Sequence, residues 1–281
     1  MSIIRHSRAA VMIVLFLQNV CVAQEPQRMP TPPAASVQLP AKNKFHLFLL
    51  MGQSNMAIGV KLDAADMAVA DRILVLDPKD GASWLPVLDK DKKPVPLGVG
   101  PGLGFAAEYA RQNPGVTVGL VPTAVGGSPL ASWEKNAALY DQALARLAKV
   151  RERGVLKAVL WHQGETDAYK TSNPNTYGAR LAQMIGDLRA DVKEPRLPFI
   201  VGEIGQFVAR KSSFTFVGII NQHLQAIPSQ VKRTACVSAS GLTDGGDSLH
   251  FSEAASHEQG RRYEKAYQQI IAADERSGVT R

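Results

Sequence analysis

Short apolar runs recur along the chain from Phe45 onward, each bounded by polar or glycine-containing segments. An uninterrupted apolar run of this length is typical of a strand buried on both faces of a parallel sheet. The predicted strands are Phe45–Met51, Ile73–Leu76, Val116–Val121, Leu156–Trp161, Phe199–Ile204 and Thr234–Val237. We therefore expect a central sheet that is mainly parallel.

The segments between these runs carry apolar residues at mixed three- and four-residue spacing, which is the period of a helix with one buried face. The predicted helices are Phe105–Arg111, Leu139–Arg153, Tyr177–Val192, Phe216–Ile227 and Glu253–Ala273. Strand and helix alternate to the end of the chain, and no internal repeat interrupts them. This alternation predicts one α/β domain over residues 44–281, folded as a three-layer α/β/α sandwich.

The first 43 residues lack this alternation. Arg5 and Arg8 precede an apolar stretch, and small residues end at Ala23, which is the order of a secretory signal peptide cleaved after that residue. The apolar stretch is shorter than the roughly 20 residues of a membrane span, so an uncleaved anchor is disfavoured. Residues 24–43 are rich in proline and read as an extended linker. We expect a secreted or periplasmic protein without stable membrane insertion.

The composition is that of a globular protein: of 281 residues, 45% are hydrophobic and 20% are charged. The formal net charge of +7 falls to +5 without residues 1–23, because these hold two arginines and no acidic residue. The basic residues are scattered and are not interleaved with aromatic residues, so we expect no nucleic-acid partner. Loss of Cys21 with the signal peptide would leave Cys236 alone, which excludes an internal disulfide.

Ligands of parallel α/β sheets bind at the carboxyl ends of the strands, and these positions hold the candidate chemistry. Ser54 follows the first predicted strand within a Gly-Gln-Ser-Asn-Met segment. Near the end of the chain, Asp247 and His250 stand three residues apart on a loop with two glycines. That spacing lets the carboxylate bind one ring nitrogen and leaves the other to take a proton from a serine. The three residues together predict nucleophilic ester or amide chemistry.

A serine nucleophile also needs hydrogen-bond donors for the negative oxygen of the tetrahedral intermediate. The backbone N–H of Ser54, that of Gly126 or Gly127, and the side-chain amide of Gln163 are the candidates. Glu203 follows the fifth predicted strand and is either a loop-bracing acid or part of the site.

A metal hydrolase is the alternative at the fourth strand end. It would use His162, Glu165 and Asp167, but their spacing fits no standard metal motif. We therefore expect neither a metal nor another cofactor in the reaction.

Six segments resemble, in their order, the motifs of carbohydrate esterase family six, the sialate O-acetylesterase-like and acetylxylan esterase-like proteins of the SGNH/GDSL hydrolase superfamily. They are GQSNM (52–56), GPGLGFA (100–106), AVGGSPLASW (124–133), WHQGETDA (161–168), VGEIGQF (201–207) and DSLHFS (247–252). The resemblance extends from Phe45 to the last predicted helix. It implies a flavodoxin-like layout and a serine esterase that removes O-acetyl groups from carbohydrates such as xylan or sialic acid.

The resemblance also implies roles for single residues. Ser54 would be the nucleophile, His250 the base, and Asp247 the orienting acid, with Glu203 as the alternative acid. The oxyanion hole would comprise the N–H groups of Ser54 and of Gly126 or Gly127, and the Gln163 amide. The supporting residues would be Gln53, Asn55, Glu165 and Asp167.

This sequence departs from the family after the first motif. Relatives often continue with Ala-Gly-Arg, whereas residues 57–60 read Ala-Ile-Gly-Val. A sugar contact carried by that arginine is therefore not expected. The alternatives are a lipid esterase or thioesterase of the same superfamily and a carbohydrate-binding protein without turnover.

Overall fold

Residues 37–276 are described by a computed structural model of the protein. The expected signal peptide and most of the expected linker lie outside these residues. No helix within the described range is both long and apolar enough to span a membrane.

A mixed sheet of seven strands runs through the described part of the chain, in the order β4-β3-β6-β1-β7-β8-β9. Neighbouring strands are parallel except for β4, which pairs antiparallel with β3 at one edge. The strands are β1 (Phe45–Gly52), β3 (Ile73–Leu76), β4 (Trp84–Pro86), β6 (Thr117–Pro122), β7 (Val155–His162), β8 (Phe199–Gly202) and β9 (Thr234–Val237). The six predicted strands are therefore confirmed, with small shifts at their ends.

Two features of the sheet region were not predicted. β4 holds only three residues and ends in proline, so it gives no apolar run. A separate antiparallel pair joins β2 (Gly59–Val60) to β5 (Leu97–Gly98), and two-residue strands are too short to show any periodicity.

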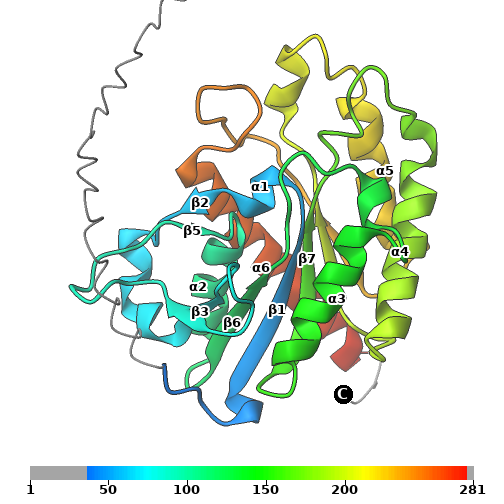
Figure 1. The fold of residues 1–281 in the computed structure, drawn as a ribbon. Coiled ribbons are helices and arrows are strands. Elements are labelled where there is room, and N and C mark those ends of the chain that lie inside the picture. Colours follow the sequence, from blue (N-terminus) through cyan, green and yellow to red (C-terminus); the bar gives the residue numbers. More distant parts are fainter. Residues whose placement is uncertain (1–36, 277–281) are drawn as a thin grey trace, which may run out of the picture. The chain divides into compact units, whose positions relative to one another are not determined.

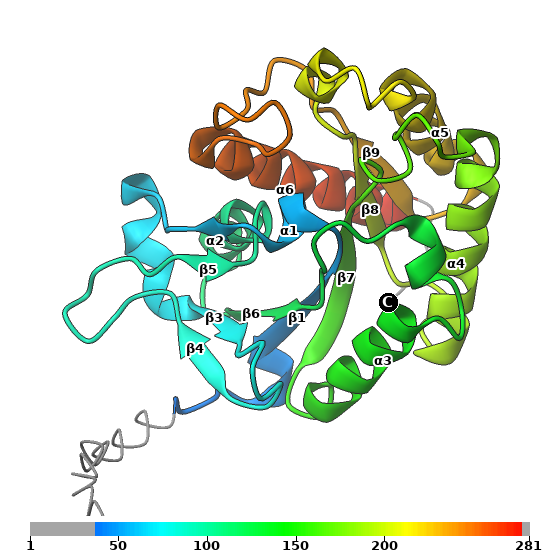
Figure 2. The same cartoon turned by 45° about the horizontal axis from the view of Figure 1, so that its top comes forward.

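Helices cover both faces of the sheet, as Figures 1 and 2 show. One face carries α3 (Ala138–Val150), α4 (Tyr177–Asp191) and α5 (Val217–Gln230), and the other carries α2 (Gly102–Gln112) and α6 (Glu253–Arg276). Short helical turns occupy the connections: α1 (Ser54–Ala57), η1 (Lys42–Lys44), η2 (Ala64–Arg72), η3 (Leu130–Trp133), η4 (Pro174–Thr176) and η5 (Gln206–Arg210). The predicted α/β/α sandwich with a mainly parallel sheet is confirmed.

The side chains of β1 alternate between two apolar cores. Leu47 and Leu49 pack with the core that contains α3, α4 and α5, whereas Phe48 and Leu50 pack with the core that contains α2 and α6. All four side chains are fully buried. The uninterrupted apolar run thus has the cause inferred from sequence, burial on both faces of the sheet.

Helices α2 and α6 approach closely because glycines lie where they cross. A Cβ atom on Gly260 would lie 2.2 Å from the carbonyl oxygen of Pro101, and one on Gly104 would lie 2.5 Å from that of His257. Neither distance leaves room for a side chain. This crossing fixes the first turns of α6, which directly follow the loop that carries His250.

Candidate active site

The turn after β1 requires glycine at position 52. Gly52 has a φ of +124°, and a Cβ atom there would lie 2.0 Å from the carbonyl oxygen of His162 on β7. That same carbonyl accepts a 2.8 Å hydrogen bond from the backbone N–H of Gln53. The chain therefore leaves the sheet sharply, and Ser54 becomes the first residue of α1 at the carboxyl end of β1 (Figure 1).

Ser54, His250 and Asp247 form a continuous hydrogen-bonded series. The Oγ of Ser54 lies 3.0 Å from Nε2 of His250, and Nδ1 of His250 lies 2.6 Å from Oδ2 of Asp247. Ionised Asp247 accepts only, so Nδ1 carries the proton and Nε2 has a lone pair for the hydroxyl of Ser54. The arrangement can withdraw a proton from the serine as the serine attacks an electrophile.

The loop itself holds Asp247 in place. Its Oδ1 accepts hydrogen bonds of 2.8 Å from the backbone N–H groups of Leu249 and His250. Burial works to raise the pKa of Asp247, but the hydrogen bonds from the backbone and ring of His250 and from Leu249, with the charge of His250, outweigh it. The pKa falls to about 2. Asp247 is therefore ionised at neutral pH, as a partner of the imidazole must be.

Free backbone donors adjoin Ser54. A Cβ atom on Gly126 would lie 3.8 Å from that of Ser54, and the N–H groups of Ser54, Gly126 and Gly127 donate no hydrogen bond within residues 37–276. The glycine turn is held in place because the N–H of Val125 donates to Gly52 O at 3.0 Å. Unbonded N–H groups beside the serine are the kind of donor that an oxyanion needs.

Asn55 connects the serine turn to the histidine loop. Its Nδ2 donates to the carbonyl of Leu249 at 3.1 Å, and its Oδ1 accepts from the N–H of Phe251 at 3.0 Å. These two residues flank His250, so one buried amide holds both sides of the histidine. Nδ2 also donates to Oε1 of Glu165. Asn55 thereby supports the site without reaching the surface, being fully buried.

Glu165 lies beneath this contact. It is buried, and its Oε1 stands 3.5 Å from Nε2 of His162, an ion-pair distance that is too long for a good hydrogen bond. Burial works to raise the pKa of Glu165, but His162 and the amide of Asn55 outweigh that effect and lower it. The ionised carboxylate is thus a stable acceptor for Asn55.

Gln163 does not stand free as an oxyanion donor. The side chain is fully buried, and its Nε2 donates within the protein, to Gln53 Oε1 and Ser128 O at 3.1 Å and to Asp167 Oδ2 at 2.6 Å. Gln53 also accepts from the backbone of Gly164 and Thr166 at 3.3 and 3.2 Å. Gln53 and Gln163 therefore join the carboxyl ends of β1 and β7, and the Gln163 amide is already occupied within the protein.

Glu203 is placed away from His250. Its Oε1 accepts from Gln225 on α5 at 2.6 Å, and its Oε2 accepts from Ser238 Oγ at 3.1 Å and Ala239 N at 2.9 Å. The carboxylate is almost completely buried and links α5 to the segment that follows β9. Of the two acids that the sequence left open, the geometry brings Asp247 to the imidazole.

The residues of the metal alternative do not converge. Asp167 accepts from the N–H of Leu130 at 2.9 Å as well as from Gln163, and it does not gather with His162 and Glu165 among residues 37–276. Among residues 37–276, three or more metal-type ligands gather elsewhere, at Asp63, Asp66 and His257.

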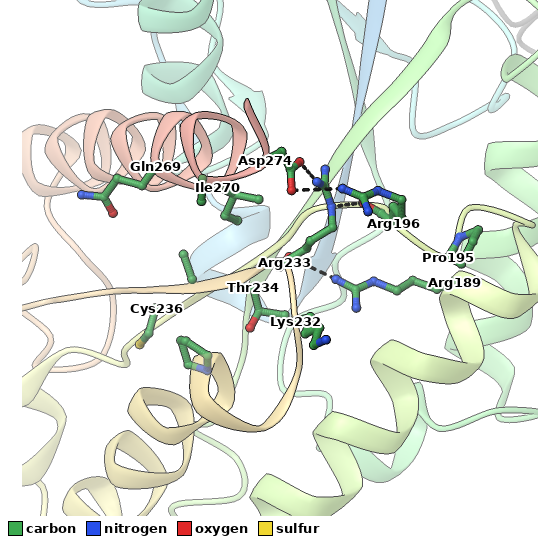
Figure 3. Close-up of a pocket in the computed structure, with 13 residues that line it drawn as sticks. Arg189, Pro195, Arg196, Lys232, Arg233, Thr234, Cys236, Gln269, Ile270 and Asp274 are labelled. Atoms are coloured by element: carbon green, nitrogen blue, oxygen red, sulfur yellow. Dashed lines mark hydrogen bonds and ion pairs between the residues drawn. The ribbon is translucent and has the colours of Figure 1, made fainter. Parts of the chain in front are cut away.

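A cavity of about 780 Å³ lies apart from this chemistry (Figure 3). It is lined by residues that precede β8 and β9, by β9 itself and by the last turns of α6. Arg196 and Arg233 both pair with Asp274 there, and Arg189 donates to the carbonyl of Arg233 at 3.1 Å. These three arginines are thus engaged with the protein, and the cavity is not a part of the serine site.

Two contributors to the site gave no signal in the sequence. Ser128 accepts from Trp133 Nε1 at 2.9 Å and donates to Val125 O at 2.8 Å, which braces the glycine turn. Tyr177 donates to the backbone and side-chain oxygens of Gln163 at 2.9 and 3.0 Å. In the sequence Ser128 is only one member of a motif and Tyr177 is only one member of a helix face, because a hydrophobic pattern does not reveal side-chain hydrogen bonds.

Comparison with known proteins places the chain among carbohydrate esterases. The family model described as "carbohydrate esterase, sialic acid-specific acetylesterase" matches residues 44–269. A relative named "probable carbohydrate esterase" from Arabidopsis thaliana is 31% identical over 240 residues, covering 79% of this chain and 89% of the relative. The crystal structure of that plant protein superposes with a TM-score of 0.67 at 27% identity, covering 80% of this chain and 98% of the other.

Two solved structures of lower identity share the fold. A protein named NanS has a TM-score of 0.66 at 18% identity, with 84% of this chain and 100% of that chain covered. A carbohydrate acetylesterase from Xanthomonas citri has a TM-score of 0.61 at 21% identity, with 81% of this chain and 57% of that chain covered.

Proposed function

Because the chain belongs to the sialic acid-specific acetylesterase family of carbohydrate esterases and is an ester hydrolase, we propose that it removes O-acetyl groups from carbohydrates through a serine acyl-enzyme. The observation that carries this proposal is the series Ser54–His250–Asp247, with contacts of 3.0 and 2.6 Å. A serine hydroxyl is protonated at neutral pH, and a positioned base of this kind contributes typically 10²–10⁴-fold in rate.

The reaction proceeds in two halves. The Oγ of Ser54 attacks the acetyl carbonyl carbon while Nε2 of His250 takes the hydroxyl proton, and the carbonyl oxygen becomes negatively charged. That oxygen accepts hydrogen bonds from the N–H groups of Ser54 and Gly126. His250 then gives its proton to the sugar oxygen as the ester bond breaks, which releases the sugar alcohol and leaves Ser54 acetylated.

Water completes the cycle. His250 takes a proton from a water molecule that attacks the acetyl-serine carbonyl, and the same N–H groups stabilise the second oxyanion. Collapse of this intermediate returns the proton to Ser54 and releases acetate. Asp247 holds the imidazole and stabilises its protonated form throughout without exchanging a proton.

The substrate is proposed to be an acetylated carbohydrate on an open surface. The side chains of Asp247 and His250 are 49% and 33% exposed, and Gly126 and Gly127 are exposed beside Ser54. A lipid esterase needs apolar surface for its acyl chain. Large hydrophobic side chains exposed within residues 37–276 are Met67, Val125 and Tyr169, of which only Val125 neighbours the glycine turn.

The substrate class is tested by acetate release from acetylated xylan and from O-acetyl sialic acid, beside aryl acetate and aryl octanoate as reporters. We expect release from at least one carbohydrate and preference for the acetate over the octanoate. Preference for the octanoate with no release from either carbohydrate would favour the lipid esterase, and no turnover of any ester would favour the binding protein.

Export is proposed from the sequence of residues 1–23. The N-terminal sequence of the protein recovered from the medium and from the periplasm tests it. We expect the chain to start at Gln24 in one of these fractions, whereas an intact Met1 confined to the cytoplasm would contradict export.

A further inference from the structure

A second group of ionisable side chains gathers where η2 meets α6. Asp63 precedes η2, Asp66 lies in its first turn, and His257 lies in α6. One ligand atom of each residue lies within 4.8 Å of the others. None of the three takes part in the proposed esterase chemistry.

The orientation of His257 is that of a metal ligand. Its Nε2 lies 2.8 Å from the backbone carbonyl of Lys61, which can only accept, so Nε2 carries a proton. The neutral imidazole then presents a lone pair at Nδ1. Within residues 37–276 that atom is buried without a hydrogen-bond partner, and the side chain is only 4% exposed. Ligating histidines typically donate their second ring N–H to a backbone carbonyl in this way.

Asp66 presents a second unpartnered atom. Its Oδ1 pairs with Arg111, but its Oδ2 is buried and has no partner in the part of the chain that the structure describes. The residue is 1% exposed. A buried carboxylate oxygen and a buried imidazole nitrogen that both lack partners are each costly. A cation between them satisfies both atoms at once.

Asp63 supplies the third ligand atom and connects the site to the surface. It is half-buried, its Oδ1 accepts from the N–H of Ala65 at 3.1 Å, and it lines a surface hollow with His257 and Lys93. The hollow gives an ion access to Asp63 and His257, and water can complete its coordination.

We propose that Asp63, Asp66 and His257 form a binding site for a divalent transition-metal cation of the zinc class. One imidazole nitrogen with two carboxylate oxygens suits zinc better than magnesium or calcium, which prefer sites made of oxygen alone. The ion stabilises the fold and takes no part in ester hydrolysis.

The site joins the two segments that carry the serine and the histidine. Residues 61–66 follow the helix that starts at Ser54, and His257 lies in the helix that follows His250. The N–H of Lys61 also donates to Glu253 Oε1 at 2.9 Å, next to the proposed site. A bound cation therefore holds together two segments separated by 196 residues of sequence.

Calorimetric titration of the chelator-treated full chain with zinc chloride tests the site, with magnesium and calcium chloride as comparisons. The titration is run in a His250→Ala background, so that zinc on that exposed imidazole is not counted. Asp63→Asn retains the cap of η2, and His257→Gln retains a donor for Lys61, but both remove a ligand. Asp71→Asn is the matched control, because Asp71 is an exposed aspartate of η2 that pairs with Lys92.

We expect one zinc ion per chain in the background and control proteins, with affinity at least tenfold lower in Asp63→Asn and His257→Gln. We also expect zinc at 100 times its Kd to raise Tm by about 5–10 °C in the background protein and not in His257→Gln. Absence of saturable zinc binding, or equal affinity in the ligand variants, would overturn the site.

Discussion

Replacement of Asn55 by alanine tests how the histidine loop is held. Asn55 is fully buried and binds Leu249 and Phe251 on either side of His250, as well as Glu165. The substitution removes these hydrogen bonds. The carboxylate of Glu165, the carbonyl of Leu249 and the N–H of Phe251 then lack a partner in an interior that water reaches poorly.

The expected loss of stability follows from the number of groups that lose a partner. A buried polar group without its hydrogen bond costs about 1–3 kcal/mol, so three such groups, with some relaxation, cost about 3 kcal/mol. For a domain of this size, that loss lowers Tm by about 6–12 °C.

The rate falls for a different reason. Release of Leu249 and Phe251 frees His250 to shift relative to Ser54, and a misplacement of about 1 Å costs about 10²-fold. Because Asn55 does not reach the surface, we expect the loss in kcat with little change in KM. Initial rates of acetate release, measured well below Tm, give both constants.

Asn221→Ala is the matched control. Asn221 is a buried asparagine whose two hydrogen bonds, both 3.0 Å, go to the backbone of Ile204, away from His250. We expect it to lower Tm but to leave kcat nearly unchanged. An Asn55→Ala protein with a lowered Tm and the rate of the parent would refute the positioning role, and an equal rate loss in Asn221→Ala would assign the effect to general loosening.

Three further predictions concern the acid, the pH and the cation. Asp247→Asn lowers kcat by about 10³–10⁴-fold. Glu203→Gln lowers Tm and leaves kcat nearly unchanged, because the hydrogen bonds of Glu203 go to Gln225, Ser238 and Ala239 and not to His250. Steady-state kinetics of the two variants would show the reverse if Glu203 were the acid. The folded-state pKa of Asp247, about 2, is below its ordinary 3.8, so its hydrogen bonds add stability that is present above about pH 4 and is lost as the pH falls to about 2. The difference in Tm between the parent and Asp247→Asn therefore narrows from about pH 5 to about pH 2.5 in thermal melts, and a constant difference would contradict the assignment. EDTA leaves kcat/KM unchanged at 25 °C but lowers Tm. A loss of kcat/KM in proportion to the metal removed, in a protein that stays folded, would show that a metal takes part in the reaction.

The sheet was predictable because its strands are buried on both faces. Runs such as Phe45–Met51 need only apolar residues, and the alternation with helices then defines the layers. β4 and the β2–β5 pair were not predictable, since strands of two or three residues depend on partners that are distant in sequence.

In the candidate site, too, contacts between residues close in sequence could be predicted and contacts between distant residues could not. Asp247 and His250 are three residues apart, so their contact could be inferred locally and the structure places them 2.6 Å apart. The contact of Asn55 with Leu249 spans 194 residues, and its geometry depends on the whole sheet. The sequence made the Gln163 amide a candidate donor for the oxyanion. Its hydrogen bonds to Gln53 and Asp167 could be known only from the folded chain.

The requirement for glycine at position 52 comes mainly from a residue that is distant in the sequence. A glycine directly after a strand suits a tight turn, and the positive φ of Gly52 agrees with it. The stronger constraint is the carbonyl of His162, which would lie 2.0 Å from any Cβ atom there. That neighbour lies on another strand and leaves no local mark.

Acetate release by the Ser54→Ala protein tests whether Ser54 is the nucleophile of ester hydrolysis. We expect a loss of about 10⁴-fold or more in kcat on an acetylated carbohydrate or aryl acetate. The Tm should stay close to that of the parent, because Ser54 is only partly buried and, within residues 37–276, its hydroxyl hydrogen-bonds to His250 alone. A folded Ser54→Ala protein that releases acetate at the rate of the parent would contradict the claim.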